Sequence, residues 1–315
     1  MPDSVQAPTG ADGSARAARG SKRSLARGLL GVSRPRQWVK NLLVLAAPGA
    51  AGLLTRPHDL LVALGAFGIF CLAASGTYFI NDSLDAAADR LHPVKRHRPV
   101  AAGVVPPSLA ATIGAVALLG AIAAAWTLAG GKLALVIAIY ALIVTAYSLR
   151  LKHEPVLDMA CVSSGFVLRA IAGGVATGIP LSVWFLTVTS FGSLLVVAGK
   201  RSAEHADLGE GRAGHRPTLG SYPATFLRSV RLLTSSVTAT AYCLWAFERA
   251  VQDGPGHHPI WFELSVIPFV LGLLILELRF ETGHGAAPEE LAFTDSSLQA
   301  LGMIWLVLFA SGVYL

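Results

Sequence analysis

The chain has 315 residues, of which 53% are hydrophobic and only 14% are charged, and its mean hydropathy is +0.58. Soluble domains usually carry about 25% charged residues, so this composition excludes an ordinary soluble protein and indicates that lipid surrounds most of the chain. The 25 Lys and Arg residues exceed the 19 Asp and Glu residues. In a membrane protein such an excess is typical of basic cytoplasmic loops rather than of nucleic-acid binding. The three cysteines all lie in apolar runs, which excludes a disulfide scaffold.

Residues 1–30 are rich in Gly, Ala, Ser and Arg and have no apolar periodicity. Such a composition is typical of a disordered segment, and no apolar core of a signal peptide follows the charges. We therefore predict a disordered cytoplasmic tail over residues 1–30 and a single membrane domain over residues 31–315.

Nine apolar segments follow the tail, and most approach the length of about 20 residues that a helix needs to cross a bilayer. The first is the shortest and is interrupted by Pro48 and Gly49. Gly and Ala fill several others, and small residues let helices pack closely in lipid. We predict an all-α integral membrane bundle of nine transmembrane helices, at about 41–55, 60–80, 107–127, 132–148, 156–178, 183–199, 230–248, 260–279 and 296–315.

These nine spans divide the basic residues unevenly between the two sides of the membrane. Of the 25 Lys and Arg residues, 21 fall on the side of the N-terminus, three fall on the other side, and Arg169 lies within a span. Because basic loops stay in the cytoplasm, the N-terminus is predicted to be cytoplasmic, the C-terminus to be outside, and the protein to lie in the plasma membrane.

The end of the second span carries the sequence NDSLDAAADR, whose acids Asp82, Asp85 and Asp89 are three and four residues apart. On a helix this spacing places the three carboxylates on one face. Like charges repel, and oxygen-only ligands suit Mg²⁺. The cluster, with Asn81 beside it, is therefore interpreted as a metal site; the alternative is a solvated acidic helix end.

A basic segment, HPVKRHRP, follows the acids directly. Beside a metal, cations hold a diphosphate and stabilise it as it leaves, and Lys95 and Arg98 are the preferred residues for this role. The alternative is an ordinary basic loop that contacts anionic lipid headgroups.

The loop before the fifth span contains further candidates for substrate binding, and Asp158 lies in the first turns of the helix that follows. Arg169 comes 11 residues later, about three turns, so it shares a face with Asp158. A structural ion pair between these two residues remains the alternative. The candidates in this region are Tyr147, Arg150, Lys152, Asp158 and Arg169.

Two more basic sites adjoin the ends of spans. Lys200 and Arg201 end the sixth span, where they can reach a cavity mouth, and the alternative is that they only mark topology. Lys40 and Asn41 precede the first span in the segment RPRQWVKN, and the alternative is an interfacial anchor around Trp38.

Taken together, these residues resemble the UbiA superfamily of intramembrane prenyltransferases. The motif N-D-x-x-D-x-x-x-D and the nine spans are similar to its first acidic motif and its nine-helix bundle. The resemblance runs from about residue 31 to the end, and the superfamily's second acidic pair is represented here by Asp158 and Glu154, so a second metal is left open. Five segments resemble the decaprenyl-phosphate phosphoribosyltransferase branch of this superfamily, namely RPRQWVKN, HPVKRHRPVAAG, YSLRLKHEPVLD, GFVLRAIAGG and GKRSAEH.

The resemblance implies a Mg²⁺-dependent enzyme, with Mn²⁺ as a substitute, whose metal ligands are Asp82, Asp85 and Asp89 and whose catalytic set also includes Asn81. It implies transfer of the phosphoribosyl group of 5-phosphoribosyl 1-diphosphate to a polyprenyl (decaprenyl) phosphate, with release of pyrophosphate from a cavity open to the cytoplasm. The product would be the precursor of decaprenyl-phosphate arabinose for the actinobacterial cell wall. The expected partners are both substrates and the bilayer, without nucleic acid, and a homo-oligomer is left open.

Two other functions compete with this interpretation. A UbiA-type prenyltransferase would attach an isoprenoid to an aromatic or quinone precursor with the same acids, but such an acceptor does not need so many cations. A transporter would place polar residues near the midplane and would typically have repeated halves, whereas here the charges cluster at one face and no repeat is evident.

Overall fold

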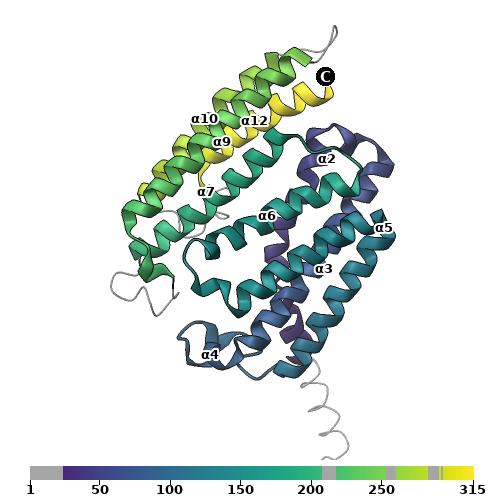
Figure 1. Cartoon of the computed structure of the whole chain (residues 1–315), viewed down its shortest axis with the longest axis vertical. Helices are drawn as coiled ribbons and strands as arrows, with labels where there is room; N and C mark the ends of the chain where they lie inside the picture. Colours follow the sequence, from purple (N-terminus) through teal and green to yellow (C-terminus); the bar gives the residue numbers. More distant parts are fainter. Residues whose placement is uncertain (1–23, 208–217, 253–259, 283–290, 292–293) are drawn as a thin grey trace, which may run out of the picture. The chain divides into compact units, whose positions relative to one another are not determined.

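The computed structural model describes residues 24–207, 218–252, 260–282, 291 and 294–315. Within these ranges all regular structure is helical and none is strand, which confirms the all-α prediction. In chain order the elements after a helix over 24–33 are η1 (Pro35–Leu45), α2 (Ala46–Ala50), η2 (Leu53–Thr55), α3 (Pro57–Leu84), α4 (Ala86–Leu91), η3 (Lys95–His97), α5 (Pro107–Leu149), η4 (Leu151–His153), α6 (Leu157–Ala176), α7 (Val183–Asp207), η6 (Leu219–Ser221), α9 (Ala224–Gln252), α10 (Ile260–Glu281) and α12 (Ser296–Tyr314) (Figure 1).

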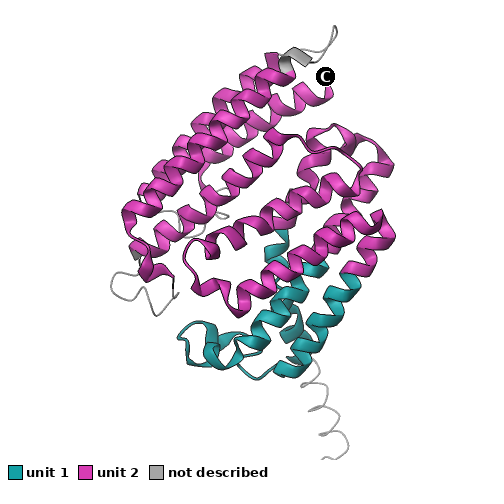
Figure 2. Ribbon diagram, viewed as in Figure 1, with its two compact units in different colours: residues 1–39, 71–121 teal, residues 40–70, 122–315 magenta. Residues whose placement is uncertain are grey.

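The chain divides into two compact units, which Figure 2 shows in different colours. Unit 1 comprises residues 1–39 and 71–121, and unit 2 comprises residues 40–70 and 122–315. The boundary passes through η1, α3 and α5 rather than through linkers. The single domain over residues 31–315 stays a prediction, and each unit is described by itself below.

Within the described residues, six helices are long and apolar enough to cross a membrane, namely α3, α5, α6, α7, α10 and α12. Helix α9 is 29 residues long but carries Arg228, Arg231 and Arg249 among many Ser and Thr residues. Six apolar helices confirm a multi-pass membrane protein, while the count of nine crossings stays a prediction.

Helix α5 is interrupted, which explains its length of 43 residues. Ala129 and Gly130 leave helical geometry, and Gly130 has a φ of 73°, which glycine adopts without steric cost. The two arms, 107–128 and 131–149, are about 33 and 28 Å long at 1.5 Å per residue. Each arm therefore has the length of one crossing, as the predicted spans 107–127 and 132–148 require.

The predicted span 41–55 is wrong as a regular α-helix. Its first part belongs to the 11-residue 3₁₀ helix η1, and only the five residues of α2 are α-helical before η2 begins. Pro48 has no backbone N–H to donate to the carbonyl of Val44, so no continuous α-helix can run from η1 through α2, and Gly52 with a φ of 71° prevents the helix from continuing beyond it. A 3₁₀ helix rises about 2.0 Å per residue, so η1 alone extends about 22 Å.

The helix over 24–33 begins inside the tail predicted for residues 1–30. Leu25, Leu29 and Val32 are three and four residues apart and so share one face. They pack in unit 1 against a buried cluster that includes Phe79 and Val100. Residues 1–23 of the predicted tail lie outside the described residues.

Unit 2 is built from helices packed side by side: α7 on α9, α10 on α12, α6 on α7 and α9 on α10 (Figure 1). The close approach of the end of η1 to α6, next to α2, depends on Gly173, because a Cβ there would overlap the carbonyl oxygen of Val44. Small residues allow such backbone contacts between helices in lipid. This packing places the start of α6 and the end of α7 beside the polar segment 218–222. Tyr222 of this segment joins the buried cluster of Met159, Val197 and Leu227.

Candidate active site

The acidic motif of unit 1 is neutralised by two arginines. Asp82 is buried and accepts a hydrogen bond from Nη2 of Arg34 at 2.6 Å. Nη1 of Arg98 lies 3.4 Å from the same Asp82 oxygen and 2.7 Å from Oδ2 of Asp89, which is also buried. One guanidinium therefore bridges two carboxylates that are seven residues apart.

The spacing of the three acids predicted that they lie on one continuous helix, but in the structure they do not. Helix α3 ends at Leu84 and α4 begins at Ala86, so the regular helix is interrupted at Asp85. Backbone hydrogen bonds from Asp85 to Asn81 and from Asp89 to Asp85 keep the two pieces close to helical register. As a result Asp82 and Asp89 converge on Arg98, whereas Asp85 and Asn81 are half-buried beside them.

Sequence reasoning missed Arg34, which looked like part of an interfacial anchor. Its backbone has a φ of 49°, a left-handed conformation that is uncommon outside glycine. Its guanidinium also lies 4.7 Å from the centre of the Tyr78 ring. Strain of this kind is often found at functional sites, but no sequence pattern signals it.

The donor set of the acidic motif fits a divalent cation in part. The carboxylates of Asp82 and Asp89 already point at one shared positive group, and hard oxygen ligands are those that Mg²⁺ and Mn²⁺ take. In the part of the chain that the structure describes, no three His, Cys, Asp or Glu side chains form a metal-binding group. The structure thus brings two of the three predicted ligands together.

The side chain of His92 stabilises a turn in the basic segment that follows the acids. Nδ1 of His92 accepts hydrogen bonds from the backbone N–H groups of Val94 (3.1 Å) and Lys95 (3.2 Å). This turn leads to η3 and to Arg98, whose contacts are the acids described above. Lys95 is half-buried, and its predicted role in phosphate binding stays a prediction, as does that of Arg98.

A second polar centre lies in unit 2 around Asp158, at the start of α6. The side chain of Asp158 is fully buried and accepts from Nε of Arg201 at 3.2 Å and from the hydroxyl of Thr218 at 3.1 Å. The hydroxyl of Tyr222 donates to its other oxygen. Arg201 itself is buried and donates to Glu204 at 3.1 Å. Asp158 therefore joins the start of α6, the end of α7 and the segment before α9.

Tyr222 is a residue of this centre that the sequence motifs did not single out. Its hydroxyl donates to Asp158 and accepts the backbone N–H of Val156, a β-branched residue with a φ of 69°. Burial, followed by the hydrogen bond to Asp158, raises the pKa of Tyr222, so the phenol stays protonated and remains a donor. The tyrosine holds the strained entry of α6 in place.

Arg169 has partners other than Asp158, so the alternative of an ion pair between them is wrong for the described residues. Its Nε donates to Asn41 at 2.7 Å, its Nη1 to the carbonyl of Gly165 at 2.7 Å, and its Nη2 to the hydroxyl of Tyr140 at 3.2 Å. Its guanidinium also lies over the rings of Phe70, Tyr140 and Phe166. Arg169 thus ties η1, α3, α5 and α6 together within unit 2.

The other predicted substrate-binding residues of unit 2 are more accessible. Arg150 and Glu154 are exposed, so the second acidic pair is split between an exposed acid and the buried Asp158. A partly exposed cation can contact a phosphate without first leaving a buried ion pair. The half-buried members of the predicted set are Lys40, Tyr147, Lys152 and Lys200.

Unit 2 also contains an apolar cavity of about 900 Å³, lined by η1, α2, α6, α7, α9, α10 and α12. Aromatic rings form much of its wall, and Tyr242 stacks on Phe269 with ring centres 3.9 Å apart while it accepts a hydrogen bond from Trp305. Trp184 donates to Glu248 at its polar end. Such a cavity suits an apolar ligand with few polar groups.

Residues 42–309 match the UbiA prenyltransferase family. Over 294 residues the chain is 44% identical to the decaprenyl-phosphate phosphoribosyltransferase of Mycobacterium tuberculosis, with coverage of 92% of this chain and 95% of that protein. It is 42% identical over 303 residues to the protein of the same name from Mycolicibacterium smegmatis, with coverage of 94% and 95%.

Among solved structures, the fold is similar to that of a UbiA homolog from Archaeoglobus fulgidus bound to GPP and Mg²⁺. The TM-score is 0.66 at 19% sequence identity, and the match covers 90% of this chain and 98% of that one. This likeness concerns the fold alone.

Proposed function

The chain belongs to the UbiA prenyltransferase family, and from this premise we propose that it transfers the 5-phosphoribosyl group of 5-phosphoribosyl 1-diphosphate to a polyprenyl (decaprenyl) phosphate, with release of pyrophosphate. The observation that carries this proposal is the similarity, over nine-tenths of both chains, to relatives named decaprenyl-phosphate phosphoribosyltransferase. The product is a lipid-linked phosphoribose, the precursor of decaprenyl-phosphate arabinose for cell-wall arabinogalactan.

The acidic motif of unit 1 is the proposed site of the donor's diphosphate. Asp82 and Asp89, with Asp85 and Asn81 beside them, would hold Mg²⁺ or Mn²⁺, which supplies neutralisation of the leaving diphosphate when bound. Arg98 contacts both buried acids, so it lies next to any charged group that these acids bind. Lys95 and Arg34 add positive charge to the same unit.

The basic residues of unit 2 are the proposed contacts of the phosphate groups. Lys40, Lys152 and Lys200 are half-buried and reach water, whereas Arg201 (2% exposed) and Arg169 (7% exposed) are buried. We therefore assign phosphate contact to the lysines and positioning of the site to the two buried arginines. The acceptor phosphate is already an anion at neutral pH, its second pKa being about 6, so the transfer needs no general base.

The apolar cavity of unit 2 is the proposed location of part of the polyprenyl chain. Its aromatic and aliphatic wall provides contacts to a hydrocarbon and few to a sugar phosphate. The cavity of about 900 Å³ is large enough for several isoprene units, and the rest of a long chain would lie in the bilayer.

The membrane topology belongs to the same proposal. Nine crossings result if α5 contributes two arms, if α9 crosses despite its polar face, and if residues 41–55 form the first crossing although they are not one regular α-helix. The basic loops then lie on the cytoplasmic side of the plasma membrane, where a highly charged donor is available.

The test is an assay of the purified protein in nanodiscs with labelled 5-phosphoribosyl 1-diphosphate, Mg²⁺ and decaprenyl phosphate. We expect a labelled lipid and an equal amount of pyrophosphate. A labelled product that forms only from a prenyl diphosphate and an aromatic acceptor would overturn the proposal in favour of the prenyltransferase alternative.

A further inference from the structure

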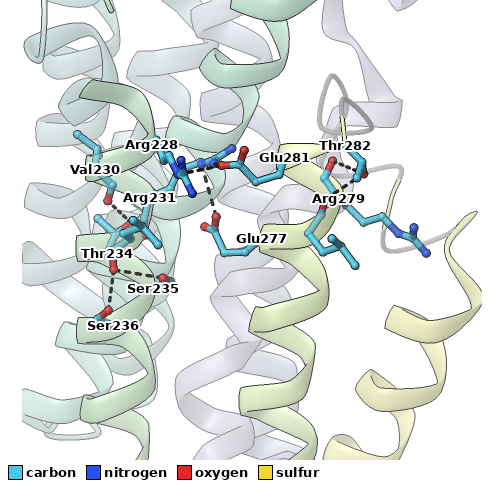
Figure 3. Close-up of polar contacts among 12 residues, drawn as sticks. Arg228, Val230, Arg231, Thr234, Ser235, Ser236, Glu277, Arg279, Glu281 and Thr282 are labelled. Atoms are coloured by element: carbon cyan, nitrogen blue, oxygen red, sulfur yellow. Dashed lines mark hydrogen bonds and ion pairs between the residues drawn. The ribbon is translucent and has the colours of Figure 1, made fainter. Parts of the chain in front are cut away.

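A cluster of four charged side chains, Arg228, Arg231, Glu277 and Glu281, joins α9 to α10 (Figure 3). Nε of Arg231 lies 3.5 Å from Glu277, and its Nη2 contacts Glu281. Only 3% of the Arg231 side chain is exposed, against 66% of the Arg228 side chain, which lies 3.6 Å from Glu281. The two arginines thus make the same kind of ion pair, one buried and one at the surface.

The buried ion pair is poorly optimised for stability. Nε of Arg231 and Oε1 of Glu277 are buried and lack a hydrogen-bond partner. A buried ion pair often fails to regain its desolvation cost, so its retention is weak evidence for a role in stability alone. Arg231 therefore calls for a role beyond joining two helices.

The guanidinium of Arg231 lies 5.8 Å from the centre of the Phe280 ring on α10, within the range of a cation–π contact. Phe280 is buried, and its ring lies directly against Gly199 of α7, where a Cβ would overlap it. The position of the ring is thus linked to the charge on one side and to the backbone of α7 on the other.

Gly199 and Arg201 are two residues apart, which is about 200° around an α-helix. The end of α7 is therefore contacted on nearly opposite faces, by Phe280 at Gly199 and by Asp158 at Arg201. Lys200 lies between them in the sequence. This end of α7 therefore lies between the Phe280 ring and Asp158.

We infer that Arg231 is a positioning residue, which acts through Phe280 and Gly199 to set the end of α7 and with it Lys200 and Arg201. This inference deepens the proposed function, because it rests on phosphate contact by Lys200. It assigns no contact with substrate to Arg231.

The first experiment compares Arg231→Met with Arg228→Met, its matched surface control. KM and kcat are measured for both substrates, and Lys200→Met identifies the substrate whose KM depends on Lys200. We expect Arg231→Met to raise that same KM by about tenfold while kcat stays within about twofold, and Arg231→Lys to recover most of the loss. Arg228→Met should match the wild type. An Arg231→Met enzyme with the KM values of Arg228→Met overturns the inference, whatever its melting temperature.

The second experiment tests the path through Phe280 and does not require Arg231→Met to fold. Gly199→Ala should raise the same KM, and the double variant Gly199→Ala/Phe280→Leu should return towards the wild type because the smaller side chain makes room for the Cβ. Additive losses in the double variant would contradict the coupling. If the wild-type protein makes no labelled lipid, the proposed function fails; if it does so and the KM values do not respond, only this inference fails.

Discussion

Two carboxylate–arginine centres of the molecule are built from the same groups and differ in their access to water. In unit 1, Asp82 and Asp89 are paired with Arg34 and Arg98, whose side chains are 28% and 27% exposed. In unit 2, Asp158 is paired with Arg201, which is only 3% exposed, and two hydroxyl groups complete its hydrogen bonds.

This difference separates exchangeable from permanent contacts. An arginine whose side chain contacts water can leave its ion pair for a phosphate without becoming a buried unpaired charge, provided that a bound cation replaces it at the buried acid. A buried arginine whose acid is removed becomes an uncompensated charge, at a cost of about 3–5 kcal/mol. The unit 1 centre is therefore suited to binding, and the Asp158 centre is suited to holding three segments in place.

The largest effect is expected from a change in the unit 1 centre, whose contacts are exchangeable. Asp82→Asn should lower Mg²⁺-dependent release of pyrophosphate by about a thousandfold, because one preorganised charge at the leaving group is lost. The melting temperature should change little, since Arg34 and Arg98 keep their contact with water. Asp59→Asn, on the same helix but outside the motif, is the control. Full activity of Asp82→Asn would show that the motif does not bind the donor.

The next effect breaks the permanent centre. Asp158→Asn should lower the free energy of unfolding by about 3 kcal/mol, because Arg201 loses its buried counter-charge and is left with its contact to the partly exposed Glu204. Denaturant unfolding in detergent measures this loss, and the exposed acid variant Glu154→Gln should unfold like the wild type. If Asp158→Asn were as stable as Asp82→Asn, the contrast between the two centres would be wrong.

A smaller effect is expected when one of the hydrogen bonds to Asp158 is removed. Tyr222→Phe removes the hydroxyl that contacts Asp158 and Val156 but keeps the ring stacked on Phe226 at 5.7 Å. The loss should be about 1–3 kcal/mol, the cost of buried polar groups left without a partner. Tyr314→Phe, whose exposed hydroxyl lies 3.4 Å from a carbonyl, should cost almost nothing in the same unfolding measurement.

The smallest effect comes from an acid at the surface, Asp295, which caps α12 and pairs with Arg279. Hydrogen bonding to the backbone N–H of Leu298 and then the contact with Arg279 lower its pKa below the ordinary 3.8. A depressed pKa contributes stability above the unfolded pKa, and this contribution is lost as the pH falls through the folded pKa. The melting temperature of the wild type should therefore approach that of Asp295→Asn between pH 5 and about pH 3; an unchanged gap would refute the assignment.

The sequence identified the residue types of both centres but not their partners. The acids Asp82, Asp89 and Asp158 follow from spacing and from their place at helix ends. Arg34 is 48 residues from Asp82, and Tyr222 is 64 residues from Asp158, so no local pattern joins them. Their pairing depends on how the helices pack, which periodicity alone does not specify.

The fold was predictable to a similar depth. Apolar length predicted the six long helices, and Gly130 accounts for the two arms of α5. Pro48 and Gly52 prevent a continuous α-helix over the segment 41–55, and contacts from distant parts of the chain hold η1, which no local pattern specifies. One such contact is the hydrogen bond from Arg169 to Asn41, 128 residues apart.

The 3₁₀ geometry of η1 has a torsional consequence. A 3₁₀ helix turns about 120° per residue and an α-helix about 100°, so relaxation of the six steps from Pro35 to Asn41 would rotate the Asn41 side chain by about 120°. That rotation would carry the amide away from Arg169 and swing Lys40 by nearly as much. The hydrogen bond between Arg169 and Asn41 therefore opposes this rotation, and it keeps the direction of Lys40 constant.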